Sequence, residues 1–157
     1  MSSRIRSAAF LRAVLAGAAS GSRSQCALAA CAVSHSPTPY RRIDAWLHKP
    51  AVRRAQVVAA AGELIGDKLP QTPSRTSPPG LLPRVALGAT AASVLAGRRG
   101  ESQRRAAAIG ALAAAATSFG GVRARAAWAA RVGSDLPGAL AEDALAVATA
   151  FTATCLP

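Results

Sequence analysis

Six alanine-rich apolar segments, most of them bracketed by arginines, restrict the fold of this chain more than any other feature. They are residues 8–20, 26–33, 55–69, 85–97, 106–122 and 139–156. No stretch alternates apolar and polar residues over the length of a strand, so the sequence predicts an all-α fold. The length of 157 residues fits a single domain, 1–157, built from these helices.

The composition favours lipid as the surroundings of the helices. Hydrophobic residues make up 51% of the chain and the mean hydropathy is +0.24, yet only 4% of the residues are aromatic. A water-soluble core built from alanine buries little area per side chain, whereas small residues let helices approach closely in a bilayer. We therefore expect a small polytopic alanine- and glycine-rich membrane bundle of about four to six short transmembrane or re-entrant helices.

The net charge of +12 has three interpretations. Nucleic-acid binding predicts basic clusters with interleaved aromatics or a recognition module, and the sequence has neither. A signal or transit peptide would explain the arginines of residues 1–43, a stretch without acidic residues. The third interpretation is an excess of basic residues in the cytoplasmic loops of a membrane protein. We favour the third, so the expected partner is the lipid bilayer and not nucleic acid.

Loop charges and segment lengths predict a multi-pass protein of the bacterial inner membrane with both termini in the cytoplasm. In this prediction residues 1–12 form a basic tail and residues 70–84 a proline-rich loop. The segment 106–122 has no charge and is about as long as the shortest spans. The first two segments are shorter, and a helical hairpin or re-entrant pair broken at residues 21–24 explains them as well as two spans do.

Prolines and glycines mark the expected helix boundaries. Pro50 can open the third helix, because a proline at the first position loses no intrahelical hydrogen bond, and Pro70 can end that helix. Gly80 precedes the fourth helix, which tolerates Pro83 in its first turn.

Two pairs of glycines at i, i+4 spacing are candidate helix contacts. They are Gly17 and Gly21 in GAASG, and Gly62 and Gly66 in GELIG. In lipid this spacing lets two helices touch along a groove of small residues. The alternative is chance, because the chain has 13 glycines and abundant alanine.

Acidic residues inside apolar helices form the candidate functional site. Glu63 and Asp67 lie four residues apart on one helical face, where like charges repel and a low-dielectric setting demands a cationic partner. The candidate polar centre consists of Glu63, Asp67, Lys68, Glu142 and Asp143, and its possible charge partners are Arg23, Arg75 and Arg84. The sequence leaves two interpretations open: a buried network that holds the helices in register, or a proton or cation pathway.

The other chemical motifs are weak. No complete catalytic, metal or nucleotide signature is present, so we expect neither an enzyme nor a bound cofactor. Cys26, Cys31 and His35 have the spacing C-x4-C-x3-H without a fourth ligand, which favours free cysteines over a zinc site. Residues 41–50, with Trp46, are typical of an interfacial amphipathic segment.

Three blocks of the sequence resemble a known family. They are GSRSQCALAA at residues 21–30, AAAGELIGDKLPQTPSRTSPPGLLPRVALGA at residues 59–89 and DLPGALAEDALAVATA at residues 135–150. The chain is similar to bacterial membrane proteins catalogued as domain of unknown function 4126, above all in the string Glu63, Asp67, Lys68 and Pro70. The resemblance implies an integral membrane protein of unassigned activity and supplies no catalytic residues.

We expect the chain to act as a structural or interaction module of the membrane, as a homo-oligomer or with another membrane protein. A proton- or cation-coupled small transporter using the same carboxylates is one alternative. A soluble or targeted helical bundle is another.

Overall fold

The computed structural model of the chain describes residues 3–34, 42–66 and 76–156, and its regular elements are helices. They are α1 (Ser3–Ser22), α2 (Cys26–Val33), α3 (Arg42–Leu47), α4 (Pro50–Gly66), α5 (Pro78–Arg98), α6 (Gln103–Val132) and α7 (Leu136–Cys155). The prediction of an all-α fold is confirmed for these residues.

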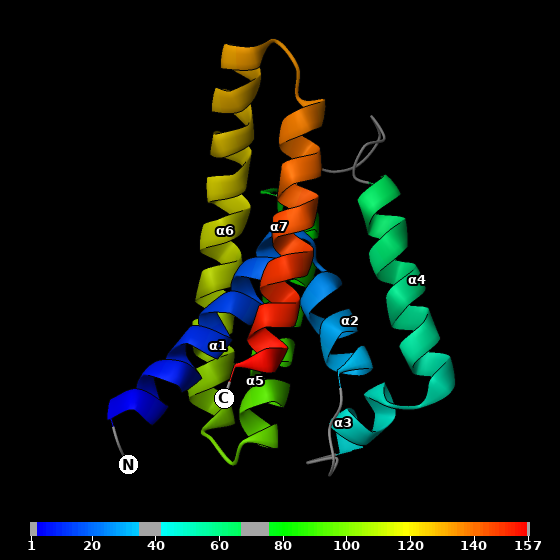
Figure 1. Cartoon of the computed structure of the whole chain (residues 1–157), viewed down its shortest axis with the longest axis vertical. Coiled ribbons are helices and arrows are strands. Elements are labelled where there is room, and N and C mark those ends of the chain that lie inside the picture. The colour runs from blue at the N-terminus through cyan, green and yellow to red at the C-terminus, as the bar shows by residue number, and fades with distance from the viewer. Residues whose placement is uncertain (1–2, 35–41, 67–75, 157) are drawn as a thin grey trace.

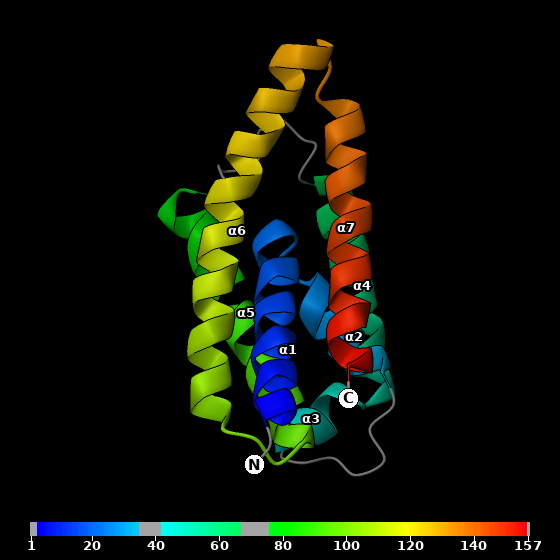
Figure 2. The same ribbon diagram turned by 60° about the vertical axis from the view of Figure 1, so that its left-hand side comes forward.

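Helices α1, α5 and α6 pack most extensively on one another, and α7 packs on α1 and α2 (Figure 1). Helix α4 lies on the outside, against α2 and α3, and has no buried residue. The start of α1, the end of α7 and the α5–α6 turn lie at the same end of the molecule (Figures 1 and 2). Arg12 and Leu156 reflect this arrangement, because the Arg12 guanidinium lies 3.4 Å from the Leu156 carbonyl oxygen.

The first two helices form a hairpin. Helix α1 ends at Ser22, three residues follow, and α2 begins at Cys26 and runs back toward the end where α1 started (Figure 1). The bounds of α2 match the predicted segment 26–33, and the break, at residues 23–25, overlaps the predicted break at residues 21–24. Seven of the eight α2 residues are buried, so this short helix forms the inside of the bundle.

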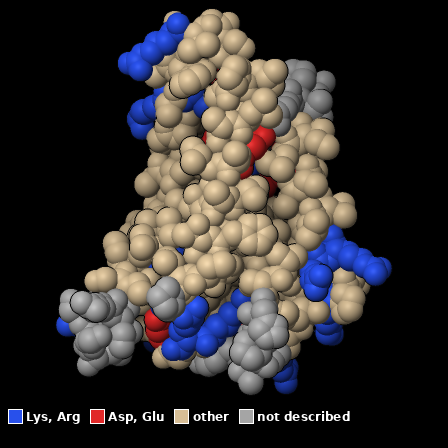
Figure 3. Space-filling view, in the orientation of Figure 1, with Lys and Arg blue, Asp and Glu red and all other residues tan. Residues whose placement is uncertain are grey.

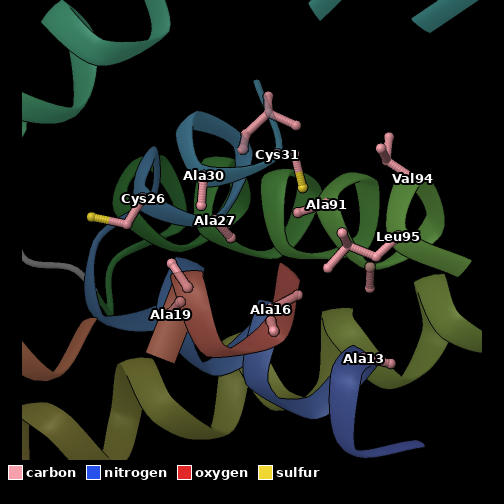
Figure 4. Packing of buried hydrophobic residues seen from close by; sticks show 14 of the residues in the cluster. Ala13, Ala16, Ala19, Cys26, Ala27, Ala30, Cys31, Ala91, Val94 and Leu95 are labelled. Carbon is pink, nitrogen blue, oxygen red and sulfur yellow. The ribbon is translucent and has the colours of Figure 1, made fainter. Parts of the chain in front are cut away.

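The core is built from small side chains. Alanines of α1, α2 and α5 face one another in the cluster that Figure 4 shows, among them Ala16 and Ala91, which are fully buried. Each buries little area, so the stability of the packing depends on how closely the helix backbones approach.

Three glycines permit that approach at one crossing of α1, α5 and α6, which we call the glycine junction: Gly17, Gly88 and Gly110. A Cβ atom on Gly17 would lie 2.2 Å from the Gly110 carbonyl oxygen, and one on Gly110 would lie 2.6 Å from the Gly88 carbonyl oxygen. One helical turn from Gly17, a Cβ on Gly21 would lie 2.4 Å from the Ala114 carbonyl oxygen. The predicted contact role of Gly17 and Gly21 is therefore confirmed, with α6 as the partner helix.

The same prediction is wrong for Gly62 and Gly66. A Cβ added to either glycine would meet no atom within 4 Å. Both lie on α4, the outer helix. No other described helix comes close enough to this part of α4 to require a glycine. Identical spacing thus has different consequences in α1 and α4, because only α1 is surrounded.

Some helix boundaries also differ from the prediction. Helix α5 begins at Pro78, so the expected loop over residues 70–84 ends earlier, and Pro83, expected in the first turn of the helix, lies in its second turn. The expected basic tail, residues 1–12, is helical from Ser3 onward. Helix α6 continues past the predicted end at residue 122 to Val132, where Gly133 takes a left-handed φ of 73° as its C-cap. Alanine and arginine are good helix formers, so the arginine-containing flanks prolong α1 and α6 instead of ending them.

Two helices, α5 and α6, are long and apolar enough to cross a membrane. With a rise of about 1.5 Å per residue, the 30 residues of α6 are longer than a bilayer core is thick. The sequence also predicted spans elsewhere, but α4 and α7 do not meet the same criterion of length and composition in the described part of the chain.

Candidate functional site

Four charged side chains converge on the turn between α1 and α2. They are Arg23 in the turn itself, Glu63 near the end of α4, Arg84 near the start of α5 and Asp143 on α7. We call these four residues the polar centre. Arg23 is 1% exposed and Arg84 is 6% exposed, so both guanidinium groups are held inside the protein.

The break between α1 and α2 leaves backbone N–H and carbonyl groups without helical hydrogen-bond partners. Side chains of the polar centre take the place of those partners. The Glu63 carboxylate accepts hydrogen bonds from the backbone N–H groups of Ser24, at 2.7 Å, and Gln25, at 2.9 Å. Arg84 donates to the carbonyl oxygens of Ser22, at 2.8 Å, and Gly21, at 3.3 Å. Buried backbone groups that lack such partners are costly, so these side chains make the turn tolerable inside an apolar bundle.

The two halves of the polar centre are ion pairs. Arg84 Nη2 lies 3.3 Å from Glu63 Oε1, and Arg23 Nε donates to Asp143 Oδ1 at 2.6 Å. Each pair joins elements that are far apart in sequence: α4 to α5 in the first, and the α1–α2 turn to α7 in the second. Arg23 and Arg84 are two of the three arginines that the sequence analysis named as partners for the acids.

Glu142 lies apart from the polar centre. Its Oε2 atom is 3.7 Å from Arg125 Nη1 on α6, and Arg125 also donates from Nε to Asp135 Oδ1 at 3.0 Å. Neighbouring positions on α7 thus serve different contacts, with Asp143 directed to the α1–α2 turn and Glu142 to α6. The predicted grouping of Glu142 with Glu63 in one polar centre stays a prediction, because Asp67 and Lys68 of that group lie outside the described residues.

Three residues of the predicted site, Asp67, Lys68 and Arg75, lie outside the described residues, as does Pro70. The expected neighbourhood of Glu63 and Asp67 therefore stays a prediction.

The other end of α2 has a second charged contact, which sequence reasoning missed. Arg98, at the end of α5, donates from Nη2 to the Cys31 carbonyl oxygen at 2.7 Å and from Nη1 to Ser34 Oγ at 2.8 Å. The same guanidinium lies 2.7 Å from the carboxylate of Asp44, a residue of α3 that is 1% exposed. A cation at a helix C-terminus also interacts favourably with the helix dipole. The available signal was an acid, Asp44, inside the segment 41–50 that we assigned to the membrane interface.

Helix α3 fits the predicted amphipathic segment in its outline. Trp46 is 46% exposed while the neighbouring Leu47 is fully buried. His48 follows the helix, with Nε2 at 3.1 Å from the Ser34 carbonyl oxygen and Nδ1 at 2.9 Å from the Asp44 carbonyl oxygen. His48 thus connects the end of α3 to Ser34, which follows α2.

The described residues contain no group of three or more His, Cys, Asp or Glu side chains arranged to hold a metal ion. Cys26, Cys31 and Cys155 are free thiols, the first two buried and the third exposed. His35, the third residue of the C-x4-C-x3-H pattern, lies outside the described residues.

Comparison with known proteins gives no match: no family model, curated protein or solved structure matches this chain. The resemblance to domain of unknown function 4126 therefore stays an expectation.

The chemistry available to the polar centre follows from its hydrogen bonds. Both oxygens of Glu63 accept backbone N–H groups, and Oε1 also faces Arg84. These contacts connect the Glu63 side chain to the turn and to α5. The arrangement is therefore suited to holding a turn in place.

Proposed function

We propose that this protein is an integral membrane protein whose polar centre acts structurally, by holding a re-entrant helical hairpin, α1–α2, inside the bundle. The observation that carries the proposal is the binding of the turn's free backbone groups by Glu63 and Arg84. Non-helical backbone at membrane depth is tolerated only where protein groups or water satisfy it.

The surface supports a lipid environment. On the face that Figure 3 shows, Lys and Arg lie mainly toward the ends of the molecule, and the surface between them is mostly uncharged apart from a small acidic patch. Large apolar side chains are exposed on several helices, including Leu112 of α6 at 72% and Leu145 of α7 at 67%. Large exposed apolar areas mark contact with lipid or with other proteins. Helices α5 and α6 have the length and composition that a membrane crossing requires, which supports the proposal.

The small-residue packing supports the same proposal. Water provides a hydrophobic drive that rewards large core side chains, whereas in lipid the packing of small residues and interhelical hydrogen bonds hold helices together. The glycine junction and the Ser118 hydroxyl, which donates to the Gly21 carbonyl oxygen at 3.1 Å, are contacts of this kind. A location in the bacterial inner membrane, and a role as a module that binds a second copy or another membrane protein, are parts of the proposal.

The competing proposal is a proton- or cation-coupled transporter that uses the same carboxylates. A carboxylate in an ion pathway must exchange its partner during transport. Glu63 has two backbone donors and an arginine, and Asp143 accepts from Arg23 at 2.6 Å, which favours the structural role.

Two experiments test these proposals. Alkaline carbonate extraction of cell membranes should leave the full-length protein in the pellet, and recovery in the supernatant would contradict the membrane location. Glu63→Gln then separates the two roles. We expect loss of folded protein, whereas normal abundance together with loss of an ion flux measured in liposomes of the wild type would support the transporter.

A further inference from the structure

A cavity of about 420 Å³ lies between the start of α1 and the α5–α6 turn, away from the polar centre. Its walls are of two kinds. Arg6, Arg99 and Arg105 contribute cations to its lining, and Phe10 and Ile109 contribute apolar surface. A volume of this size is within the range of small-molecule sites.

The charge of the cavity is not neutralised locally. None of Arg6, Arg99 and Arg105 forms an ion pair with an acid among the described residues, and all three are exposed. Glu101 also lines the cavity, but its carboxylate forms an ion pair with Arg12, which is buried. Three arginines on one small surface thus present a positive field to any ligand that enters.

The backbone adds to that field. Ser102 lines the cavity and is the N-cap of α6, so the first N–H groups of a 30-residue helix point toward this end of the molecule. Gly100, with a left-handed φ of 66°, makes the tight turn that places Arg99 beside the start of α6. Guanidinium groups and helix N-termini are both common partners of phosphate oxygens.

The apolar wall determines which phosphate compound fits best. Phe10 is 57% exposed and presents apolar surface at the cavity. A free phosphate would leave this wall in contact with water, whereas a lipid would cover it with an acyl chain. The cavity also lies at the end of the molecule where α1 starts and α5 ends, at the expected level of lipid headgroups.

We propose that this cavity binds the headgroup phosphate of an anionic phospholipid, with Arg6, Arg99 and Arg105 on the phosphate and Phe10 and Ile109 on the acyl chain. The inference rests on the proposed membrane location. It assigns a ligand class to a surface that the polar centre does not use.

The test is lipid titration of the detergent-purified full-length protein, with thermal unfolding as the readout. The probes are dioleoyl phosphatidylglycerol, dioleoyl phosphatidylcholine and inorganic phosphate. We expect phosphatidylglycerol to stabilise the protein at concentrations about tenfold lower than the other two probes. Equal stabilisation by phosphatidylcholine would show that the cavity does not recognise the negative charge of the headgroup and would overturn the proposal. Equal stabilisation by inorganic phosphate would show that the ligand need not be a lipid and would overturn it as well.

A matched pair of variants locates the site. Arg99→Gln with Arg105→Gln should weaken the phosphatidylglycerol effect about tenfold. Arg53→Gln with Arg54→Gln removes the same charge from exposed positions on α4, outside the cavity, and should leave the effect unchanged. Equal responses of the two double variants would overturn the assignment.

Carbonate extraction reports on the membrane location separately. Retention in the pellet without lipid selectivity refutes the cavity as a lipid site and leaves the membrane proposal intact. Release into the supernatant refutes the membrane proposal, and the lipid site with it.

Discussion

Glu63 binds the backbone N–H of Ser24 at 2.7 Å although the two residues are 39 positions apart. At the opposite end of the same short helix, Arg98 binds the Cys31 carbonyl oxygen at 2.7 Å. Helix α2 is therefore closed at its N-terminus by a carboxylate and at its C-terminus by a guanidinium, the signs that its dipole favours. Eight residues are too few for a stable isolated helix, so these contacts and burial define it.

Replacing Glu63 with Gln should destabilise the protein. An amide cannot accept both backbone N–H groups of the turn, and Arg84 would lose its counter-charge in a buried position. We expect a loss of about 2 to 4 kcal/mol in the free energy of unfolding, measured in detergent micelles. Asp135→Asn is the control, because its ion pair with Arg125 is half exposed and should contribute less than about 1 kcal/mol. Equal effects of the two substitutions would refute a special role for Glu63.

A glycine-to-alanine substitution should have opposite effects inside and outside the glycine junction. Gly17→Ala should cost about 2 kcal/mol or more, because the new Cβ would overlap the Gly110 carbonyl oxygen. Gly62→Ala meets open space and should stabilise α4 by up to about 1 kcal/mol through helix propensity. Thermal unfolding of both variants checks this, and a stabilising Gly17→Ala would show that the helices are farther apart than described.

Removing Arg98 should open the C-terminal end of α2. Arg98→Met leaves Asp44 buried without this cation and the Cys31 carbonyl without this donor, at an expected cost of about 3 kcal/mol. The local consequence is faster maleimide labelling of Cys31, which is fully buried in the wild type. Arg104→Met, at an exposed position in the first turn of α6, is the control and should leave the labelling rate unchanged. Rapid labelling of Cys31 in the wild type would argue against the packing of α2.

Thiol accessibility also tests the proposed orientation in the membrane. Cys155 is exposed near the end of α7, whereas Cys26 and Cys31 are buried. A membrane-impermeant maleimide should label one cysteine, Cys155, in inside-out vesicles and none in right-side-out vesicles. Labelling from the outer face instead would reverse the topology, and labelling of Cys26 or Cys31 at the same rate would contradict the hairpin.

The sequence predicted the helices better than their contacts. Hydrophobic segmentation located α2 to the residue, because charged and polar residues flank a continuous apolar run there. It underestimated α6, which continues through Gly120 and Gly121 to Val132 because the alanines and arginines that follow are good helix formers. Helix propensity is a local property, so it can be predicted from the sequence.

Contacts between helices depend on which faces the topology surrounds. GAASG and GELIG have the same spacing, but only the first meets another backbone. Gly88 and Gly110 were missed because each precedes an alanine, not a glycine, at i+4, a pattern that the composition repeats in many places. The arginine partners of the acids were easier to name, since a buried carboxylate needs a cation and arginines flank most of the apolar segments.

A double-mutant cycle on Arg23 and Asp143 tests the structural role of the polar centre most directly. Arg23→Met, Asp143→Ala and the double variant are unfolded in detergent, and the three changes in unfolding free energy are compared. We expect each single substitution to cost about 3 kcal/mol and the double substitution to cost little more than either, which gives a coupling energy of about 2 kcal/mol or more. Additive losses, with a coupling energy near zero, would contradict the account that this ion pair holds the α1–α2 turn against α7.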